Sequence, residues 1–314
     1  MTLTRRDLVK AAIAHQSTAR IPYCIDLCPE AWEVLKKHTD LPSPVEFVDN
    51  DVMDWSAPWW GWHTLGPDWA QPEVPTSRAK TIGSGSYPDF VEGVKKARQT
   101  SDKYFLVRQY GIHFEKAYFA RGFENFLADI GSEPAFAKKF LTSIIDRNLV
   151  MLENFLSLDE IDGVLLGSDW GSQLDTLMSV DNWDELIRPG EQKMYDLVKA
   201  FGKDVWIHSC GNISRLIPRL IDMGVQVLNP VQPEAMDIAE LKRKYGHKLT
   251  FWGGISTQKT LPYGTPDEVR AEARQVRNLL SHNGGYILSP AQSIQDDVPV
   301  PNILALLEVA RENI

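Results

Sequence analysis

The sequence lacks an excess of positive charge and any long apolar run. Its 33 lysines and arginines are outnumbered by 42 aspartates and glutamates, which gives a formal net charge of -9. No basic stripe lies along a candidate helix, so nucleic acid and anionic membrane surfaces are excluded as partners. No uninterrupted apolar run approaches the roughly 18 residues that a membrane-spanning helix requires. We therefore expect a globular protein that acts on small molecules.

Cysteine is also scarce, with Cys24, Cys28 and Cys210 as the three examples in 314 residues. An odd and sparse set argues against a disulfide framework and favours a reducing compartment. Arg5 and Arg6 resemble a twin-arginine export signal, but the apolar stretch after them stops near His15, and no small-residue cleavage site follows. We interpret this stretch as an N-terminal helix and expect a cytoplasmic protein.

A glycine-rich dinucleotide turn is missing after the first candidate strand, which argues against an open dinucleotide-binding sheet. What is present is an alternation of short apolar runs with longer segments of helical period. The candidate strands are 21–27, 46–53, 104–107, 164–166, 205–207, 225–228, 249–252 and 286–288. The clearest candidate helices are 133–156, 182–201, 213–223, 238–245, 266–280 and 300–311. Eight βα units predict a (β/α)8 TIM barrel in a single domain, residues 1–314.

An irregular insertion at about residues 55–100 separates the second and third candidate strands. It carries five of the ten tryptophans, namely Trp55, Trp59, Trp60, Trp62 and Trp69. These indoles could form an aromatic wall over the barrel mouth, with Trp59 and Trp60 binding a flat substrate. The alternative is that they form a small satellite core.

Polar residues follow nearly every candidate strand, where the active sites of barrels lie. They are Asp26 and Cys28, Arg108 and Gln109, Ser168 to Gln173, His208 to Asn212, Asn229 to Gln232, Gly253 to Gln258, and Ser289 to Gln292. We expect these side chains to converge on one mouth. A protein that only binds a ligand is disfavoured by this recurrence.

His208 and Cys210 are two residues apart at the end of a strand, so their side chains should project to the same side. An imidazole and a thiolate together suit Zn²⁺. The alternative is a hydrogen-bonded histidine beside a buried free thiol. Asp169 could bind the metal, act as a base or orient a ligand, or it could simply cap a helix. Cys28 remains a candidate third ligand, whereas packing is the expected role of Cys24.

Several segments resemble the uroporphyrinogen decarboxylase superfamily. They are His208 to Asn212, Asn229 to Pro233, Phe251 to Gln258 and Gly284 to Leu288, and the resemblance covers roughly residues 168–312. It implies a (β/α)8 barrel, in agreement with the strand count. Two branches share that fold: porphyrinogen decarboxylases that need no cofactor, and corrinoid-dependent methyltransferases that use zinc.

The decarboxylase branch carries an arginine-rich segment after its first strand, which grips substrate carboxylates. Residues 24–30 of this chain contain no arginine, and the late histidine of that branch is missing from residues 289–294. A metal-free decarboxylase or lyase, using Arg108 and His208 on a small carboxylate or a porphyrinogen-like substrate, is therefore the alternative hypothesis.

The methyltransferase branch is similar in its His-x-Cys pair, matched here by His208 and Cys210. Its further cysteine, late in the chain, is replaced by Ala291 or Gln292, which leaves Gln292, Asp169, Cys28 or water as the third ligand. The resemblance implies Zn²⁺ as a Lewis acid and a corrinoid, methylcobalamin in its methylated form, on a separate carrier protein. It also implies a homodimer.

We accordingly predict a methyltransferase that moves a methyl group from a small methylated substrate to the carrier. An aromatic methyl ether, and hence O-demethylation, is the favoured substrate class. Asp169, His208 and Gln173 are the predicted catalytic residues, and His208 and Cys210 the metal ligands. The predicted substrate-binding residues are Trp59, Trp60, Arg108, Trp170, Asn229, Gln232, Gln258 and Gln292.

Overall fold

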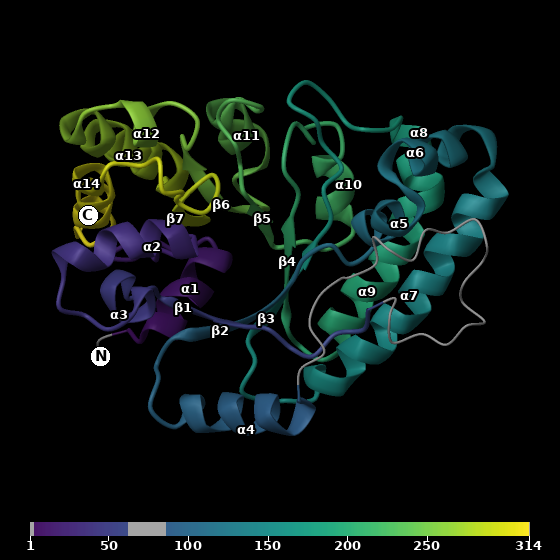
Figure 1. The fold of residues 1–314 in the computed structure, drawn as a ribbon, viewed down its shortest axis with the longest axis horizontal. Helices are drawn as coiled ribbons and strands as arrows, with labels where there is room; N and C mark the ends of the chain where they lie inside the picture. Colours follow the sequence, from purple (N-terminus) through teal and green to yellow (C-terminus); the bar gives the residue numbers. More distant parts are fainter. Residues whose placement is uncertain (1–2, 62–85, 314) are drawn as a thin grey trace.

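One curled parallel β-sheet forms the centre of the computed structural model, which describes residues 3–61 and 86–313 (Figure 1). Its strands are β1 (Val52–Trp55), β2 (Tyr104–Gln109), β3 (Gly163–Gly167), β4 (Asp204–His208), β5 (Val227–Asn229), β6 (Thr250–Ile255) and β7 (Tyr286–Pro290). Each strand pairs in parallel with its neighbour in chain order. The strands from β3 to β7 are buried along their whole length, which explains why they read as continuous apolar runs.

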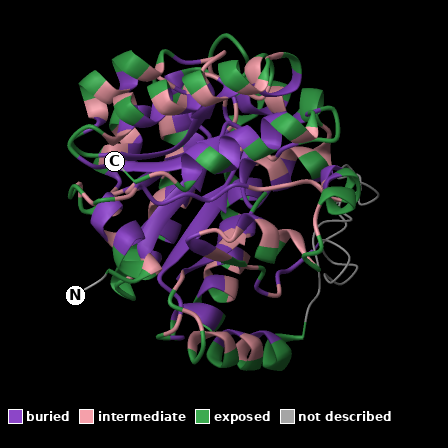
Figure 2. Cartoon of the chain, turned by 90° about the vertical axis from the view of Figure 1, so that its left-hand side faces the viewer, coloured by how far each residue is buried: buried purple, intermediate pink, exposed green. Residues whose placement is uncertain are grey.

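Helices surround this sheet, with buried strands across the middle and exposed outer helix faces in Figure 2. They are α1 (Arg5–Ile13), α2 (Pro29–Leu35), α3 (Pro44–Val48), α4 (Tyr87–Arg98), α5 (Phe114–Arg121), α6 (Phe123–Ser132), α7 (Pro134–Leu156), α8 (Val180–Asn182), α9 (Arg188–Ala200), α10 (Ile217–Asp222), α11 (Ile238–Tyr245), α12 (Thr260–Tyr263), α13 (Pro266–Ser281) and α14 (Val300–Ala310). A short 3-10 helix, η1 (Lys36–His38), and a π-helix, η5 (Trp183–Ile187), complete them. No described helix is long and apolar enough to cross a membrane.

The predicted helices are largely confirmed, because their start signals are local. Thr4 and Thr265 each form a capping box with an acid three residues later, Asp7 and Glu268. The N-terminal helix is α1, and the predicted helix 133–156 is α7. The predicted helix 182–201 is interrupted by η5, so it consists of α8, the π-helix and α9.

Two predicted strands need correction, so the sheet has seven strands among the described residues rather than eight. In the range 46–53, residues as far as Val48 belong to α3, and the strand begins only at Val52. The range 21–27 makes only isolated parallel bridges, Tyr23 to Leu288 and Leu27 to Ile294. Pro22 has no N–H to donate, which limits a regular ladder there.

The segment 21–27 nevertheless lies between the two edges of the sheet. On one side, Leu288 N donates to Pro22 O (2.8 Å) and Cys24 N to Leu288 O (3.0 Å). On the other side, Asp51 N, just before β1, donates to Tyr23 O (3.0 Å). The segment therefore bridges β7 and the start of β1 without being a strand.

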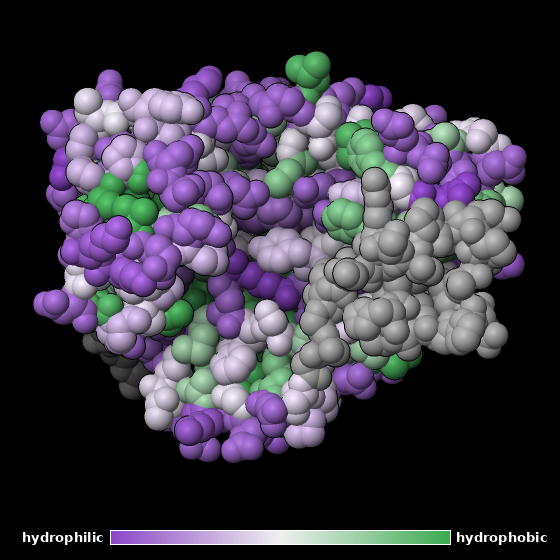
Figure 3. Space-filling view, viewed as in Figure 1, coloured by the Kyte–Doolittle hydropathy of each residue, from purple (hydrophilic) through white to green (hydrophobic). Residues whose placement is uncertain are grey.

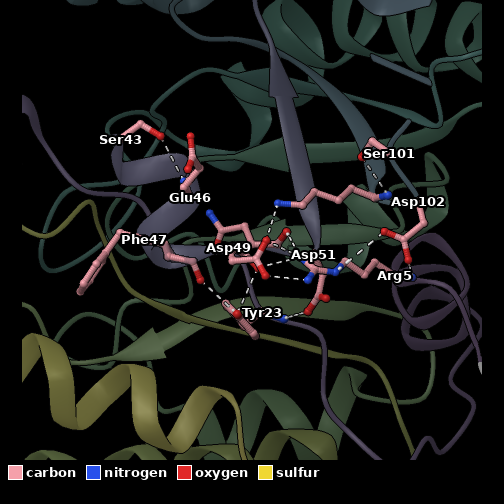
Figure 4. A network of polar contacts seen from close by, with 12 residues as sticks. Arg5, Tyr23, Ser43, Glu46, Phe47, Asp49, Asp51, Ser101 and Asp102 are labelled. Atoms are coloured by element: carbon pink, nitrogen blue, oxygen red, sulfur yellow. Dashed lines mark hydrogen bonds and ion pairs between the residues drawn. The ribbon is translucent and has the colours of Figure 1, made fainter. Parts of the chain in front are cut away.

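Side chains reinforce this seam, as Figure 4 shows for the network around Tyr23. The Asp51 carboxylate accepts from Tyr23 N (2.9 Å) and pairs with Arg20 (2.6 Å). Arg5, on α1, pairs with Asp49 (2.6 Å), and the Tyr23 hydroxyl donates to Val48 O (3.0 Å). Ion pairs thus hold the segment against β1 where backbone pairing is sparse.

The inside of the curled sheet is filled by inward-facing residues of its strands, two of them from β2, by Cys24 and by α1. The members of this cluster include Val9, Ala12, Cys24, Val52, Leu106, Leu165, Trp206, Val227, Trp252 and Ile287. Because side chains alternate along a strand, the residues two positions further on face inward as well, nearer the carboxyl ends. Those residues are Asp54, Arg108, Gly167, His208, Asn229 and Ser289. Gly254 departs from this alternation, because its φ is +94° and a Cβ there would face Val276 and Leu280 of α13. The polar residues at the carboxyl ends of the strands therefore lie directly above the apolar cluster inside the sheet.

Candidate active site

A cavity of about 310 Å³ opens at the carboxyl ends of the strands. Its lining consists of Asp26, Arg108, Tyr110, His208, Asn229, Trp252, Ser289, Pro290, Ala291, Gln292 and Ser293. The space-filling view is hollowed near its centre, where hydrophilic side chains gather (Figure 3). We call this space the first cavity.

His208, the last residue of β4, is held in one tautomer by its neighbours. Its Nδ1 lies 2.5 Å from Asn229 Oδ1, while Asn229 Nδ2 donates to Trp252 O (3.1 Å). The amide oxygen must therefore accept, so Nδ1 carries the proton and Nε2 keeps the lone pair. Burial holds the pKa of His208 below its ordinary value, which keeps the imidazole neutral.

Cys210 and Asp169 face the Nε2 atom of His208. The distance from Nε2 is 3.3 Å to Cys210 Sγ and 3.7 Å to Asp169 Oδ1. The three donor atoms all lie within 4.8 Å of one another. Burial, together with the charges of Asp169 and Glu115, raises the pKa of the Cys210 thiol to about 12. A divalent cation bound here would offset the negative charges of Asp169 and Glu115 and would favour the Cys210 thiolate.

Two glycines set the position of Asp169 relative to Cys210. A Cβ on Gly211, whose φ is +78°, would lie 2.5 Å from Ser172 O, and one on Gly171 would lie 2.6 Å from Cys210 O. The loops after β3 and β4 therefore pack backbone against backbone. This contact lets Cys210 N donate to Asp169 Oδ1 at 2.8 Å.

Glu115 is a site residue that the sequence analysis missed. It lies in the first turn of α5, and its Oε2 accepts from Asp169 N (3.2 Å). Burial and the Asp169 carboxylate raise its pKa to about 7. Glu115 reaches the site from a helix rather than from the end of a strand, so no local pattern in the sequence indicated it.

Arg108 is enclosed by acceptors on the opposite side of the first cavity. Its guanidinium pairs with Asp26 Oδ2 (2.5 Å) and Asp54 Oδ1 (2.6 Å) and lies 3.1 Å from Cys24 Sγ. It also stacks over Trp252, with 4.6 Å to the ring centroid. Cys24, Asp26 and Asp54 form a second group of potential metal donors, but the guanidinium already supplies the cation there.

A second cavity of about 420 Å³ lies on the other side of Cys210 and shares Ala291, Gln292 and Ser293 with the first. The predicted residues Gln173, Gln232, Gln258 and Gln292 all line it, together with Gln295, Thr257 and Asp297. Gln232 Nε2 donates to Gln173 Oε1 (3.4 Å), and Gln292 Nε2 lies 3.7 Å from Cys210 Sγ. The sequence-predicted glutamines thus meet beside the cysteine.

The tryptophans that were predicted to bind substrate, Trp59, Trp60 and Trp170, line neither cavity. Trp59 and Trp60 are 3% and 5% exposed and belong to the core, where Trp60 Nε1 donates to Asn148 Oδ1 (2.7 Å) on α7. Trp170 is fully buried and packs edge-on against Trp183. Of the described lining residues, the one tryptophan in either cavity is Trp252. Trp59 and Trp60 therefore pack in the main hydrophobic core and form neither an aromatic wall nor a separate satellite core, and Trp62 and Trp69 lie outside the described residues.

Cys28, a candidate third ligand, has another role. Its Sγ accepts from Ala31 N (3.3 Å) and caps the start of α2. Asp169, rather than Cys28, completes the group with His208 and Cys210.

Comparisons with known proteins find one matching family model and relatives of two kinds, methyltransferases and decarboxylases. Residues 92–313 match the family model described as uroporphyrinogen decarboxylase (URO-D). A methylcobamide:CoM methyltransferase MtaA from Methanosarcina barkeri is 29% identical over 136 residues, which cover 43% of this chain and 38% of that protein. A uroporphyrinogen decarboxylase from Chlorobium phaeobacteroides is 24% identical over 189 residues, covering 57% of this chain and 50% of that protein.

Among solved structures, a methyltransferase from Methanosarcina mazei superposes with a TM-score of 0.71 at 17% identity and covers 98% of both chains. At that identity, the superposition shows a shared fold. The matched part of the chain spans half or less of the length of the curated relatives named above.

Proposed function

This chain belongs to the uroporphyrinogen decarboxylase (URO-D) family, and from that premise we propose that it is the methyltransferase of a corrinoid-dependent system. The observation that carries the proposal is the position of the His208 and Cys210 pair between the two cavities. His208 lines the first cavity, and Cys210, whose Sγ is 3.3 Å from His208 Nε2, lines the second. Two cavities that meet at a group of metal donors suit a reaction with two substrates. The first cavity would hold the small molecule, and the second would face the corrinoid of a carrier protein.

The donor set fits Zn²⁺. A neutral imidazole nitrogen, a cysteine thiolate and a carboxylate oxygen are common zinc ligands, and three protein ligands leave a position open for substrate. When bound, Zn²⁺ would supply a Lewis acid that makes the methyl-bearing heteroatom a better leaving group. His208, Cys210 and Asp169 would hold it, and Asn229 would keep the His208 lone pair directed at it.

The remaining residues have supporting roles in this proposal. Glu115 would position Asp169 through the Asp169 N–H. Gln173, Gln232, Gln258 and Gln292 would offer neutral hydrogen-bond donors and acceptors to the amide-bearing rim of a corrinoid. An aromatic methyl ether loses its support as the preferred donor, because Trp59 and Trp60 are buried in the core.

The alternative, a metal-free lyase, depends on Arg108 binding a substrate carboxylate. Asp26 and Asp54 already occupy this guanidinium, and Trp252 covers its face. A substrate carboxylate would have to displace a protein carboxylate and would face the other one. The methyltransferase is therefore the better interpretation.

The experiment that tests the proposal combines zinc-loaded protein, reduced corrinoid and a panel of small methylated amines, thiols, alcohols and ethers. We expect at least one donor to methylate the corrinoid, measured by the change in corrinoid absorbance. The reverse assay, from methylated corrinoid to a thiol, covers the other direction. Absence of transfer in both directions, with release of CO₂ from a small carboxylate, would instead establish the lyase.

Replacing Asn229 by alanine is expected to lower zinc affinity by about 10- to 100-fold, because His208 loses the partner that fixes its tautomer. Competition with a chromophoric chelator measures this. Asn229→Asp keeps an acceptor for Nδ1–H and is expected to retain most of the affinity. Equal affinities of the parent protein and Asn229→Ala would show that the amide has no part in metal binding.

A further inference from the structure

A third cavity, of about 40 Å³, lies between α7, η5 and α9, and it shares no lining residue with the first or the second cavity. The helices α7 and α9 lie side by side in the outer layer (Figure 1). A site for one water molecule needs about 10–15 Å³, so this cavity has room for a ligand of only a few heavy atoms. Its polar lining residues are His113, Lys138, Thr142, Glu185 and Lys193, and the others are apolar.

His113, the N-cap residue of α5, lines this cavity with a ring whose second nitrogen has no partner. Its Nδ1 lies 2.8 Å from Glu191 Oε1, and the two side chains are 0% and 1% exposed. Its Nε2 is buried and makes no hydrogen bond within the described part of the chain. A buried polar nitrogen without a partner costs free energy. A ligand that supplies the missing partner is therefore expected beside this edge of the ring.

The charge of the buried pair determines what Nε2 needs. We expect His113 and Glu191 to be neutral overall, because an uncompensated charge at full burial is costly. An imidazolium beside a carboxylate carries hydrogen on both ring nitrogens. A neutral imidazole that accepts from a protonated carboxyl group keeps its hydrogen on Nε2. Nε2 is a donor in both arrangements, so the missing partner is an acceptor.

Two lysines add positive charge to the same cavity. Lys138 of α7 and Lys193 of α9 line it, and neither forms an ion pair with a carboxylate among residues 3–61 and 86–313. Glu185 also lines the cavity but is exposed. Two ammonium groups against one carboxylate leave one positive charge in excess. An acceptor that carries a negative charge therefore fits this cavity better than a neutral one.

Close packing around the imidazole shows that the fold itself builds this site. A Cβ on Gly190 would lie 2.8 Å from His113 Cε1 and 2.6 Å from Ile145 Cγ1. Gly190 therefore lets α9 pack against both the ring and α7. Glu191, the next residue of α9, holds Nδ1. The ring is thus positioned by α9 from two neighbouring residues.

We propose that the third cavity binds a small monovalent anion such as chloride, which accepts from His113 Nε2–H and lies beside the ammonium groups of Lys138 and Lys193. A water molecule would supply the acceptor but not the negative charge, and it is the occupant that the test must exclude. The inference goes beyond the proposed function and does not depend on it, because no residue of the first or second cavity takes part.

The NMR line width of chloride measures binding, because chloride that exchanges with a site on a slowly tumbling protein relaxes rapidly. We expect the parent protein to broaden the signal, and bromide or nitrate to reverse the broadening by competition. Gluconate, which is larger than the cavity, should not compete. The double variant Lys138→Gln with Lys193→Gln should bind chloride about fivefold or more weakly, since both ammonium groups are solvent-exposed.

Matched variants assign the effect to this cavity. Lys139→Gln changes an exposed lysine next to Lys138 that does not line the cavity, and it should leave the broadening unchanged. His113→Asn offers Glu191 an amide donor but lacks the Nε2–H, and it should bind chloride most weakly. Circular dichroism checks that each variant is folded, and the lysine variants decide if His113→Asn is not. Chloride held by a metal at Cys210 would contribute equally to all these proteins.

Bromide in crystals of the parent protein locates the ion by anomalous scattering, and we expect a peak beside His113 Nε2. Absence of broadening by the parent protein would overturn the inference and leave water as the occupant. Equal broadening by the parent and the double lysine variant, an equal loss in Lys139→Gln, or no bromide peak in the third cavity would overturn it as well. None of these measurements involves methyl transfer, so the proposed function and this inference can fail separately.

Discussion

Cys210→Ser is expected to lose stoichiometric zinc and to reduce methyl transfer by at least about 100-fold. Changes to outer-shell partners of a metal already cost about 10- to 100-fold in affinity, so the loss of a ligand should exceed that. The serine hydroxyl cannot replace the thiolate, which is one of the strongest zinc ligands in proteins. Elemental analysis of freshly purified protein measures the metal, and the corrinoid assay measures transfer. The double variant His208→Ala with Cys210→Ala should contain no zinc at all.

Cys28→Ser is the matched control for this experiment. Cys28 uses its sulfur to accept from Ala31 N at the start of α2, a position where serine is a preferred residue. The control should therefore keep both its zinc and its activity. If Cys210→Ser retained full zinc content, or if the control lost it to the same extent, the assignment of Cys210 as a ligand would be wrong.

Arg108→Met should destabilise the folded protein by about 3–5 kcal/mol near neutral pH. The substitution keeps much of the side-chain volume against Trp252 but leaves Asp26 and Asp54 facing each other without their shared cation. Urea denaturation followed by circular dichroism gives the free energy of unfolding. This change is expected to have the largest effect on stability of those we propose.

The loss of unfolding free energy in Arg108→Met should depend on pH. Arg108 lowers the pKa of Asp54, so its removal raises that pKa further above about 7, whereas the unfolded carboxyl keeps its ordinary value. A folded-state pKa above the unfolded value means that stability is lost as the pH rises between the two. The deficit should thus be smaller at pH 5 than at pH 8.

The second substitution Asp54→Asn should restore much of the lost stability at pH 8, because only one carboxylate then remains beside the position of the lost guanidinium. Identical deficits at pH 5 and pH 8, or no recovery in the double variant, would show that charge repulsion is not the cause. The loss would then reflect packing against Trp252 alone.

Several parts of the site were predictable because they depend on local sequence. Side chains alternate along a strand, so His208 and Cys210 at the end of β4 were expected to share a side, and the structure places their donor atoms 3.3 Å apart. Glutamines after four different strands were expected to converge, and they line one cavity. In parallel sheets, the carboxyl ends of neighbouring strands meet at one edge, which is why spacing along the chain was informative.

Other parts were not predictable because they depend on contacts between distant segments. Glu115 reaches Asp169 from a helix 54 residues away in the chain. Trp59 and Trp60 resemble the aromatic residues of a binding site in sequence, yet their indoles pack in the core, with Trp60 bonded to Asn148. Nothing in the local pattern distinguishes a buried indole from an exposed one, because aromatic residues serve both purposes.

By itself, the sequence determined the parallel βα order, the approximate extent of the long helices α7, α9, α13 and α14, and the identity of the residues at the strand ends, since periodicity and capping act over a few residues. Only the tertiary structure decided that the segment 21–27 joins the sheet by isolated bridges rather than as a strand. It also decided that Asp26 and Asp54 neutralise Arg108. The pairing of these charges depends on distances across the barrel mouth, which the fold sets and no local pattern encodes.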